Sequence, residues 1–286
     1  MLWAAAGIYF NYQFNIQDDW VYVSDNVLSF LRQWLVYFLA YAVPMIFVVI
    51  NEKKRPAFKS VWFWLILVFA PMVFAFTSVY DILDAFNYGS AELNILQFYH
   101  KISYWLTQML VVLIFSLLIW LLKDKKNLKW YGFDFKNHAV KPYWIMLLIM
   151  VIPILLAGQT QGFQSMYPRI KSIMNPNYEP LGMLEYILFE LAYGLNFLGI
   201  EVFFRGFLVM ALVNILGKDA ILPMAVFYVS IHFTKPMGEC ISSFFGGSLL
   251  GIISYHTNSI KGGLLVHVGI AWMMEIAGGV GGMFSF

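Results

Sequence analysis

Residues 196–216 read Asn-Phe-Leu-Gly-Ile-Glu-Val-Phe-Phe-Arg-Gly-Phe-Leu-Val-Met-Ala-Leu-Val-Asn-Ile-Leu, a run as apolar as a membrane span except for Glu201 and Arg205. A charged side chain in a span costs roughly 2.5–3.5 kcal/mol on insertion scales, so such residues usually face the interior of a helix bundle. Because the two residues lie four positions apart, one helix face can carry both and let them pair. A self-neutralised structural pair and a functional site both explain them.

The composition of the whole chain fits the same environment. Of its 286 residues, 61% are hydrophobic and only 12% are charged, whereas about a quarter of a soluble domain is charged. Apolar runs of about 15–25 residues recur along the chain. The sequence therefore predicts an all-α fold, a polytopic transmembrane helix bundle with eight or nine spans.

Several other classes of protein lack support. The single cysteine, Cys240, excludes an internal disulfide and a cysteine-rich metal site. The chain has no glycine-rich phosphate loop and no basic patch interleaved with aromatic residues, so we expect no nucleic-acid partner. Residues 1–10 lack a basic region and a cleavage site, and we expect a short span or interfacial segment there.

Charges in the loops predict the orientation of the chain. Acidic residues gather in the loops around Asp18 and Asp81. Basic loops follow the apolar runs 30–50 and 102–122, and the second of them holds Lys123, Lys125, Lys126, Lys129, Lys136 and Lys141. Because basic loops remain in the cytoplasm, we expect these two loops to face that side.

The chain divides into two parts of one integral membrane domain. Residues 1–182 form N-terminal spans and loops, and residues 183–286 form a core of membrane helices that carries the charged pair. As one helix, the apolar stretch 183–216 would be about 50 Å long against a hydrocarbon core of about 30 Å. We therefore expect it to tilt, kink or divide near Gly194 or Gly199.

Small residues mark a later apolar run of the core. Ser243, Gly247 and Gly251 follow one another at intervals of four. Small side chains at this spacing allow the backbones of two membrane helices to approach closely. The pattern therefore predicts a close helix–helix contact along this run.

Two histidines, His232 and His267, fall inside late apolar runs of the core. With Glu201 they form a set that can activate water, because a carboxylate and an imidazole can share proton transfer. A second histidine can stabilise an oxyanion. Two imidazoles and a carboxylate can instead hold a divalent metal such as zinc with an open position. The sequence does not decide between a metal site and a site that works without any cofactor.

Three further carboxylates lie near these candidates. Glu190 precedes Glu201 by eleven positions, about three helical turns, and would share its face on a continuous helix. Glu239 follows Lys235-Pro236 just beyond the first of the two histidines, and Glu275 comes eight residues after the second. Either of the last two could join the site or serve as an interfacial charge.

Three short motifs in residues 183–278 carry a family resemblance. They read Ile200-Glu201-Val202-Phe203-Phe204-Arg205-Gly206, Tyr228-Val229-Ser230-Ile231-His232 and His267-Val268-Gly269-Ile270-Ala271. In order and spacing they resemble the motifs Glu-Glu-x-x-x-Arg, Phe-x-x-x-His and His-x-x-x-Asn of the CPBP family, the CAAX proteases and bacteriocin-processing enzymes. The resemblance implies that all three lie in membrane helices that converge on one cavity.

The sequence departs from the family motifs at three positions. Ile200 replaces the first Glu, Ala271 replaces the Asn and Tyr228 replaces the Phe. In the family, the first Glu and the histidine of the second motif are taken to activate water, and the third motif forms the oxyanion hole. The resemblance therefore implies that Glu201 serves as the base. The implied catalytic residues are Glu201, Arg205, His232 and His267, with Glu239, Glu190 and Tyr228 as auxiliary residues.

The chain also resembles a bacterial subgroup of this family. That subgroup has a single Glu before Phe-Phe-Arg-Gly and a Lys-Pro-x-x-Glu sequence after the second motif, which here is Lys235–Glu239. The resemblance gives weight to Glu239 and implies a bacterial cytoplasmic (inner) membrane.

Three functions remain as hypotheses. The first is an intramembrane endopeptidase that acts on a peptide or membrane-protein substrate in contact with membrane lipid. The second is a catalytically impaired pseudoprotease that serves as a membrane scaffold, chaperone or immunity protein with a membrane-protein partner, because the family residues at Ile200 and Ala271 are lost. A transporter is less favoured, since no inverted repeat is visible in the sequence.

Overall fold

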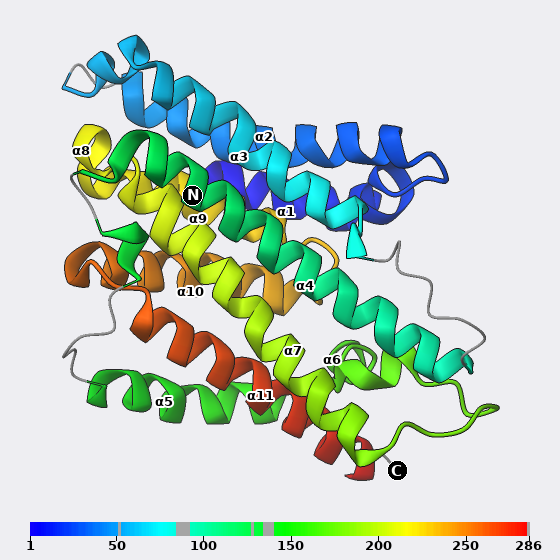
Figure 1. Ribbon diagram of the computed structural model, residues 1–286. Helices are drawn as coiled ribbons and strands as arrows, with labels where there is room; N and C mark the ends of the chain where they lie inside the picture. Colours follow the sequence, from blue (N-terminus) through cyan, green and yellow to red (C-terminus); the bar gives the residue numbers. More distant parts are fainter. Residues whose placement is uncertain (51–52, 84–91, 127–128, 134–139, 285–286) are drawn as a thin grey trace. The chain divides into compact units, whose positions relative to one another are not determined.

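The computed structural model describes residues 1–50, 53–83, 92–126, 129–133 and 140–284. Within these ranges the regular structure is helical and includes no strand, which confirms the all-α prediction. The helices are α1 (Leu2–Phe14), α2 (Asn26–Ile50), α3 (Val61–Val79), α4 (Leu93–Ile119), α5 (Lys141–Ala157), α6 (Gln161–Gln164), α7 (Met183–Glu201), α8 (Val213–Leu216), α9 (Ile221–Ser230), α10 (Met237–Thr257) and α11 (Lys261–Phe284) (Figure 1).

Six helical segments in the described part of the chain are long and apolar enough to cross a membrane. They are Asn26–Ile50, Val61–Val79, Leu93–Asp124, Met183–Ser230, Met237–Thr257 and Lys261–Val280, and the shorter Lys141–Ala157 is also apolar. The predicted number of eight or nine spans is not confirmed. Within Met183–Ser230 the regular structure is divided among α7, α8 and α9.

Two compact units make up the chain, and both are discontinuous in sequence. The first unit comprises Met1–Tyr80, Val111–Lys136 and Ile200–Gly263. The second comprises Asp81–Leu110, Asn137–Gly199 and Leu264–Phe286. Helices α4, α7 and α11 each contribute residues to both units. The division into residues 1–182 and 183–286 stays a prediction, and Lys136 of the basic loop lies outside the described residues.

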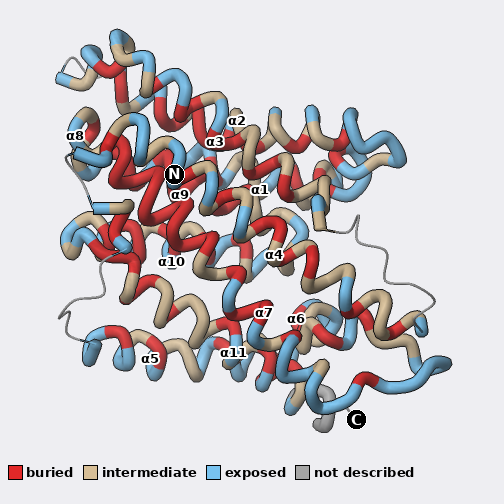
Figure 2. The backbone as a smooth tube through the Cα atoms, viewed as in Figure 1, coloured by how far each residue is buried: buried red, intermediate tan, exposed pale blue. Residues whose placement is uncertain are grey.

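The core of the first unit is aromatic. The ring of Phe74 in α3 lies 5.2 Å from the rings of both Phe203 and Phe204 and 6.0 Å from that of Phe227 in α9. Every residue of α9 except Leu222 is buried, so this helix forms the centre of the unit (Figure 2). Between membrane helices such close van der Waals packing replaces the hydrophobic effect as a source of stability.

The second unit has a separate apolar cluster built on α4 and α7. Trp105 packs against Phe189 and Tyr193, with ring centroids 4.8 Å and 5.0 Å apart. Asn94 at the start of α4 fastens the loop before α7, because its Nδ2 donates to Glu179 O at 2.8 Å and its Oδ1 accepts from Asn175 N at 2.8 Å. The amide thereby satisfies backbone groups that no regular element pairs.

The apolar stretch 183–216 changes from α-helix to π-helix after Glu201, and not at the two glycines where the sequence predicted a break. Helix α7 continues through Gly194 and Gly199 to Glu201, and the backbone then forms π-helical turns over Val202–Leu208. A Cβ at Gly194 would lie 3.1 Å from Cζ2 of Trp272. This glycine therefore serves close packing rather than a bend, and the prediction of a break there was wrong.

Candidate active site

The first motif begins at the junction between α7 and the π-helical segment. Arg205 Nη1 lies 3.2 Å from Glu201 Oε1, and both side chains are fully buried. A π-helical turn closes its hydrogen bonds five residues apart instead of four, and such turns recur at functional sites. Removing one partner of a buried ion pair costs about 3–5 kcal/mol, since the other charge stays buried without compensation.

The guanidinium of Arg205 also lies over an aromatic ring. Its Cζ is 3.9 Å from the ring centroid of Tyr228 in α9. The ring of Tyr228 therefore compensates the buried cation together with the Glu201 carboxylate. A desolvated cation–π contact contributes about 2 kcal/mol or more. The first and second motifs are thus joined through Arg205 and Tyr228.

His232 lies outside the helix in which the sequence placed it. Helix α9 ends at Ser230, and His232 belongs to the turn before α10. Pro236 prevents the helix from continuing through this turn, because it has no N–H to donate and disfavours helical backbone at Lys235. The prediction that His232 lies inside a span was therefore wrong, and the side chain is half-buried in a turn.

The contacts of His232 define its tautomer. Its Nδ1 lies 2.9 Å from the carbonyl oxygen of Tyr228, and its ring meets the Tyr228 ring edge-on at 4.7 Å. A carbonyl oxygen only accepts hydrogen bonds, so we assign the proton of the neutral imidazole to Nδ1. Nε2 is then the acceptor nitrogen, the form in which a histidine can serve as a general base.

Side chains of both motifs form one continuous row in the first unit. The row runs from the Glu201 carboxylate to Arg205, from its guanidinium to the Tyr228 ring, and from that ring to His232. The sequence predicted each of these four residues, and the structure brings them together within one unit. Glu201 pairs with Arg205, and the row connects this pair to the imidazole.

The sequence interpretation missed Gly263, which borders the Glu201 carboxylate. A Cβ at this position would collide with Glu201 Oε2 and lie 3.2 Å from its Cδ. The start of α11 can therefore approach the carboxylate only because this residue has no side chain. The sequence signal was the pair Gly262-Gly263 at the start of the last apolar run.

Small residues on α10 form the other wall of the row. A Cβ at Gly247 would lie 2.8 Å from Cδ1 of Tyr228, and one at Gly251 would lie 2.6 Å from Cε of Met224. The predicted close contact along Ser243, Gly247 and Gly251 is therefore confirmed, with α9 as the partner helix. Because of this contact, the backbone of α10 at Gly247 packs directly against the Tyr228 ring.

A tight turn, Trp130–Gly132, supports the π-helical segment from another side. A Cβ at Gly206 would lie 2.5 Å from the carbonyl oxygen of Tyr131, so this motif glycine permits direct backbone contact. The hydroxyl of Tyr131 donates to Asp124 Oδ2 at 2.8 Å. Burial raises the pKa of Tyr131, and the hydrogen bond to the Asp124 carboxylate raises this pKa further.

The same buried cluster holds the backbone after the motif. Lys123 Nζ donates to Asp124 Oδ1 at 2.7 Å and to the carbonyl oxygen of Ala211 at 2.6 Å. Ala211 lies where the helix breaks before α8, so its carbonyl has no regular helical partner there. A residue predicted only as a cytoplasmic loop charge thus fastens the end of the motif segment.

Glu239 forms a local ion pair at the start of α10. Its Oε1 lies 3.5 Å from Nζ of Lys235, one helical turn earlier, and both side chains are about one-fifth exposed. A carboxylate in the first turn of a helix is also stabilised by the helix dipole. The Lys235–Glu239 sequence therefore has a structural role, and an auxiliary catalytic role of Glu239 stays a prediction.

The remaining candidates lie in the second unit. His267 in α11 stacks on Phe197, with ring centroids 4.3 Å apart. Glu190 lies on α7, and the Glu275 carboxylate on α11 accepts from the backbone N of Arg169 at 2.8 Å. The prediction that His267 shares a cavity with Glu201 and His232 joins residues of both units and stays a prediction, as does an auxiliary role of Glu190.

Metal binding finds no support in the arrangement of side chains. Throughout the described residues, no three His, Cys, Asp or Glu side chains come close enough to hold one ion. The zinc alternative, with Glu201, His232 and His267 as ligands, was the metal set that the sequence suggested, and these residues form no such group.

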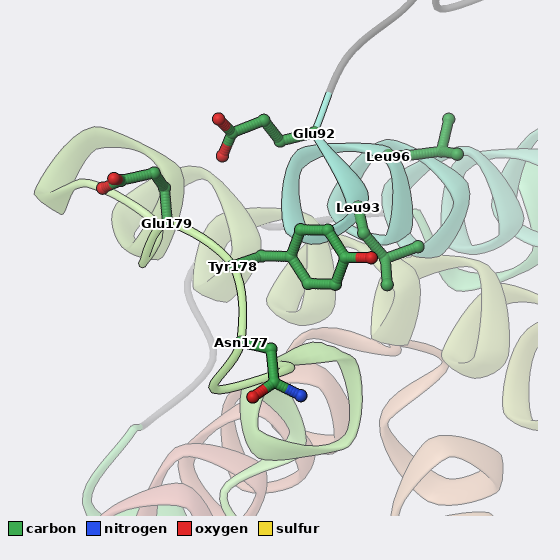
Figure 3. A pocket seen from close by; sticks show the side chains of 6 residues that line it. All are labelled: Glu92, Leu93, Leu96, Asn177, Tyr178 and Glu179. Carbon is green, nitrogen blue, oxygen red and sulfur yellow. The ribbon is translucent and has the colours of Figure 1, made fainter.

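A pocket of about 560 Å³ lies in the second unit (Figure 3). Its side chains come from the start of α4 and from the loop before α7, and they are Glu92, Leu93, Leu96, Asn177, Tyr178 and Glu179. None of the predicted site residues lines it.

Comparison with protein families assigns the motif segment. Residues 182–273 match the family model described as type II CAAX prenyl endopeptidase Rce1-like. In these residues the chain is similar to that family of membrane endopeptidases. The match contains the three motifs and, together with the apolar helices, establishes an integral membrane protein. No curated protein and no solved structure matches the chain.

Two positions of the matched segment, Ile200 and Ala271, have surroundings that suit their apolar side chains. Ile200 is buried next to Glu201, and Ala271 is buried in the cluster that contains Trp105 and Phe189. A polar side chain at either position would need a hydrogen-bond partner inside the packed helices. The apolar side chains of Ile200 and Ala271 therefore fit the packing around them.

Proposed function

We propose that this protein is an intramembrane endopeptidase of the CAAX protease type. The observation that carries the proposal is the row from Glu201 through Arg205 and Tyr228 to His232, whose Nδ1 lies 2.9 Å from the carbonyl oxygen of Tyr228. It lies in the segment that matches a CAAX prenyl endopeptidase family. We further propose that the basic loops face the cytoplasm of a bacterial cell.

The proposed reaction uses one water molecule. Its oxygen attacks the carbonyl carbon of the scissile peptide bond while Glu201 and His232 take up its proton. Arg205 positions Glu201, and His267 donates a hydrogen bond to the developing oxyanion. The carbon–nitrogen bond then breaks, and the leaving amine receives the proton. The products are a new carboxylate and a new amine.

The test is cleavage of a membrane-delivered peptide by purified protein in lipid nanodiscs. His232→Ala and Glu201→Gln are expected to lower turnover by at least 100-fold, the usual size of an acid–base contribution. His256→Ala is the matched control, because this histidine is exposed at the end of α10. Full turnover in both site variants would sink the assignment.

Peptide pairs with and without a prenyl group test the substrate class. The matching family is described as a prenyl endopeptidase. We expect cleavage near the C-terminus of the prenylated peptide at a lower KM, since the lipid anchors it in the bilayer. Equal rates on both peptides would show that prenylation is not recognised.

The packing around Ile200 and Ala271 favours a second candidate function. In it, the protein keeps the fold and binds a membrane protein as a scaffold, chaperone or immunity protein without cleaving it. The variant Ile200→Glu/Ala271→Asn separates the two candidates. A gain of turnover from zero would support the non-catalytic function of the natural chain, whereas strong turnover of the natural chain would exclude it.

A further inference from the structure

The turn that carries His232 lacks the regular support of a helix. Its carbonyl groups follow the end of α9, where no later turn of the helix pairs them. Inside the turn, His232 N donates to Val229 O at 2.9 Å and Lys235 N donates to His232 O at 2.9 Å. The carbonyls of Phe233 and Lys235 accept instead from outside the turn.

Both of these carbonyls accept from neighbouring residues of α1. Asn11 Nδ2 donates to Phe233 O at 2.9 Å, and Tyr12 Oη donates to Lys235 O at 2.5 Å. The partners are more than 200 positions apart in sequence, and α1 lies outside the residues that match the family model. A segment foreign to the matched core thus holds the histidine turn on both sides of Thr234.

Helix α1 is itself fixed, so it can act as a rigid support. Asn11 is buried, and its Oδ1 accepts from Gln17 N at 3.1 Å in the π-helical segment after α1. Gln17 is hydrogen-bonded in turn to Gln33 of α2. At Gly7, one helical turn before Asn11, a Cβ would touch Cζ of Phe233 at 3.4 Å.

We infer that Asn11 and Tyr12 are positioning residues for His232. They clamp the turn so that the imidazole keeps its Nδ1 at the carbonyl of Tyr228 and its ring in one orientation. The inference rests on the proposed function for its catalytic part. Misplacing a catalytic group by about 1 Å can cost 100-fold in rate, which is why a turn needs this support.

A kinetic cycle tests the catalytic part. Asn11→Leu/Tyr12→Phe removes both donors with little change in side-chain volume. We expect kcat to fall about tenfold or more with KM within about twofold. In the His232→Ala background the same change should have no further effect, because the clamp acts through the imidazole. Gln13→Leu, at an exposed position of α1, is the matched control.

Two results would overturn the inference. One is a turnover equal to that of the natural chain, and the other is an equal loss of kcat in the presence and absence of His232, which would reveal a general effect on folding. Turnover retained in His232→Ala itself would instead overturn the proposed function.

Backbone hydrogen exchange tests the clamp without any catalysis. We expect the amides of His232 and Lys235 to exchange at least tenfold faster in Asn11→Leu/Tyr12→Phe, while the amides of α3 keep their rates. An unchanged rate in the turn would refute the clamp whether or not the protein cleaves peptides. Faster exchange with unchanged kcat would refute only the positioning of His232 and leave the proposed function standing.

Discussion

At the scale of single residues, the row is organised around one fully buried cation. Arg205 is balanced by Glu201 on one side and by the face of Tyr228 on the other. The sequence identified Glu201 and Arg205 because charges in an apolar run are costly, and it identified Tyr228 only through the family resemblance. It did not identify Gly263, since a glycine carries no chemistry and its role depends on the neighbour that approaches it.

The aromatic ring of Tyr228 should contribute more to the stability of the protein than its hydroxyl group does. Tyr228→Phe keeps the ring over Arg205, so we expect a free energy of unfolding within about 0.5 kcal/mol of the natural chain and retained turnover. Tyr228→Leu removes the ring face and should destabilise the protein by about 2 kcal/mol or more. Denaturation in detergent measures both. Equal stability of the two variants would contradict a cation–π role.

Gly263 should tolerate no side chain. Gly263→Ala places a methyl group against the Glu201 carboxylate, and we expect a loss of about 1–3 kcal/mol in the free energy of unfolding with a drop in turnover. Gly246→Ala in α10 is the control, because a Cβ there meets nothing within 4 Å. It should be neutral or stabilising by up to about 1 kcal/mol. A neutral Gly263→Ala variant would show that the carboxylate has room to move.

At the scale of elements, three short irregular segments decide where the site residues lie. The π-helical turns Val202–Leu208, the Trp130–Gly132 turn and the turn that carries His232 all interrupt or follow regular helices. Hydrophobic patterning predicts long helices well, but it is insensitive to a single extra residue in a turn. The placement of His232 was therefore predicted incorrectly, although Lys235-Pro236 was a visible helix-ending signal.

Tyr131, in the Trp130–Gly132 turn, should make the free energy of unfolding depend on pH in alkaline solution. Tyr131 lies outside the helices that can span a membrane, and its pKa in the folded protein is raised. The stabilisation from the neutral phenol is therefore fully present below the ordinary tyrosine pKa of about 10. It is lost as the pH rises from there toward the folded-state pKa, because the unfolded chain ionises first.

Tyr131→Phe measures this contribution. The variant loses the hydrogen bond to Asp124, and we expect it to be less stable by about 1.5–3 kcal/mol at pH 8. The difference from the natural chain should shrink above about pH 10. Unfolding curves between pH 7 and 11 test this. A difference that stays constant over that range would show that Tyr131 has an ordinary pKa.

At the scale of the whole molecule, the orientation in the membrane is open to a direct test. Basic loops predict that Lys125 faces the cytoplasm and that Asp19 faces the other side. Both residues are exposed, and the single native cysteine, Cys240, is buried. In a Cys240→Ala background, a membrane-impermeant thiol reagent should label Asp19→Cys in intact cells and Lys125→Cys only after lysis. The reverse labelling would invert the topology.

The amino-acid sequence alone determined the helical membrane fold and identified the charged pair and both histidines. It also carried the resemblance that the family match supports. These follow from local chemistry, because the cost of a charge in an apolar run and the spacing of motifs are properties of the chain itself. The tertiary structure decided what surrounds them. It showed that Tyr228 links Arg205 to His232, that Gly263 borders Glu201, and that α1 holds the histidine turn. Apart from the contact between Tyr228 and His232, these contacts join residues of different elements, so only the packing of helices determines them.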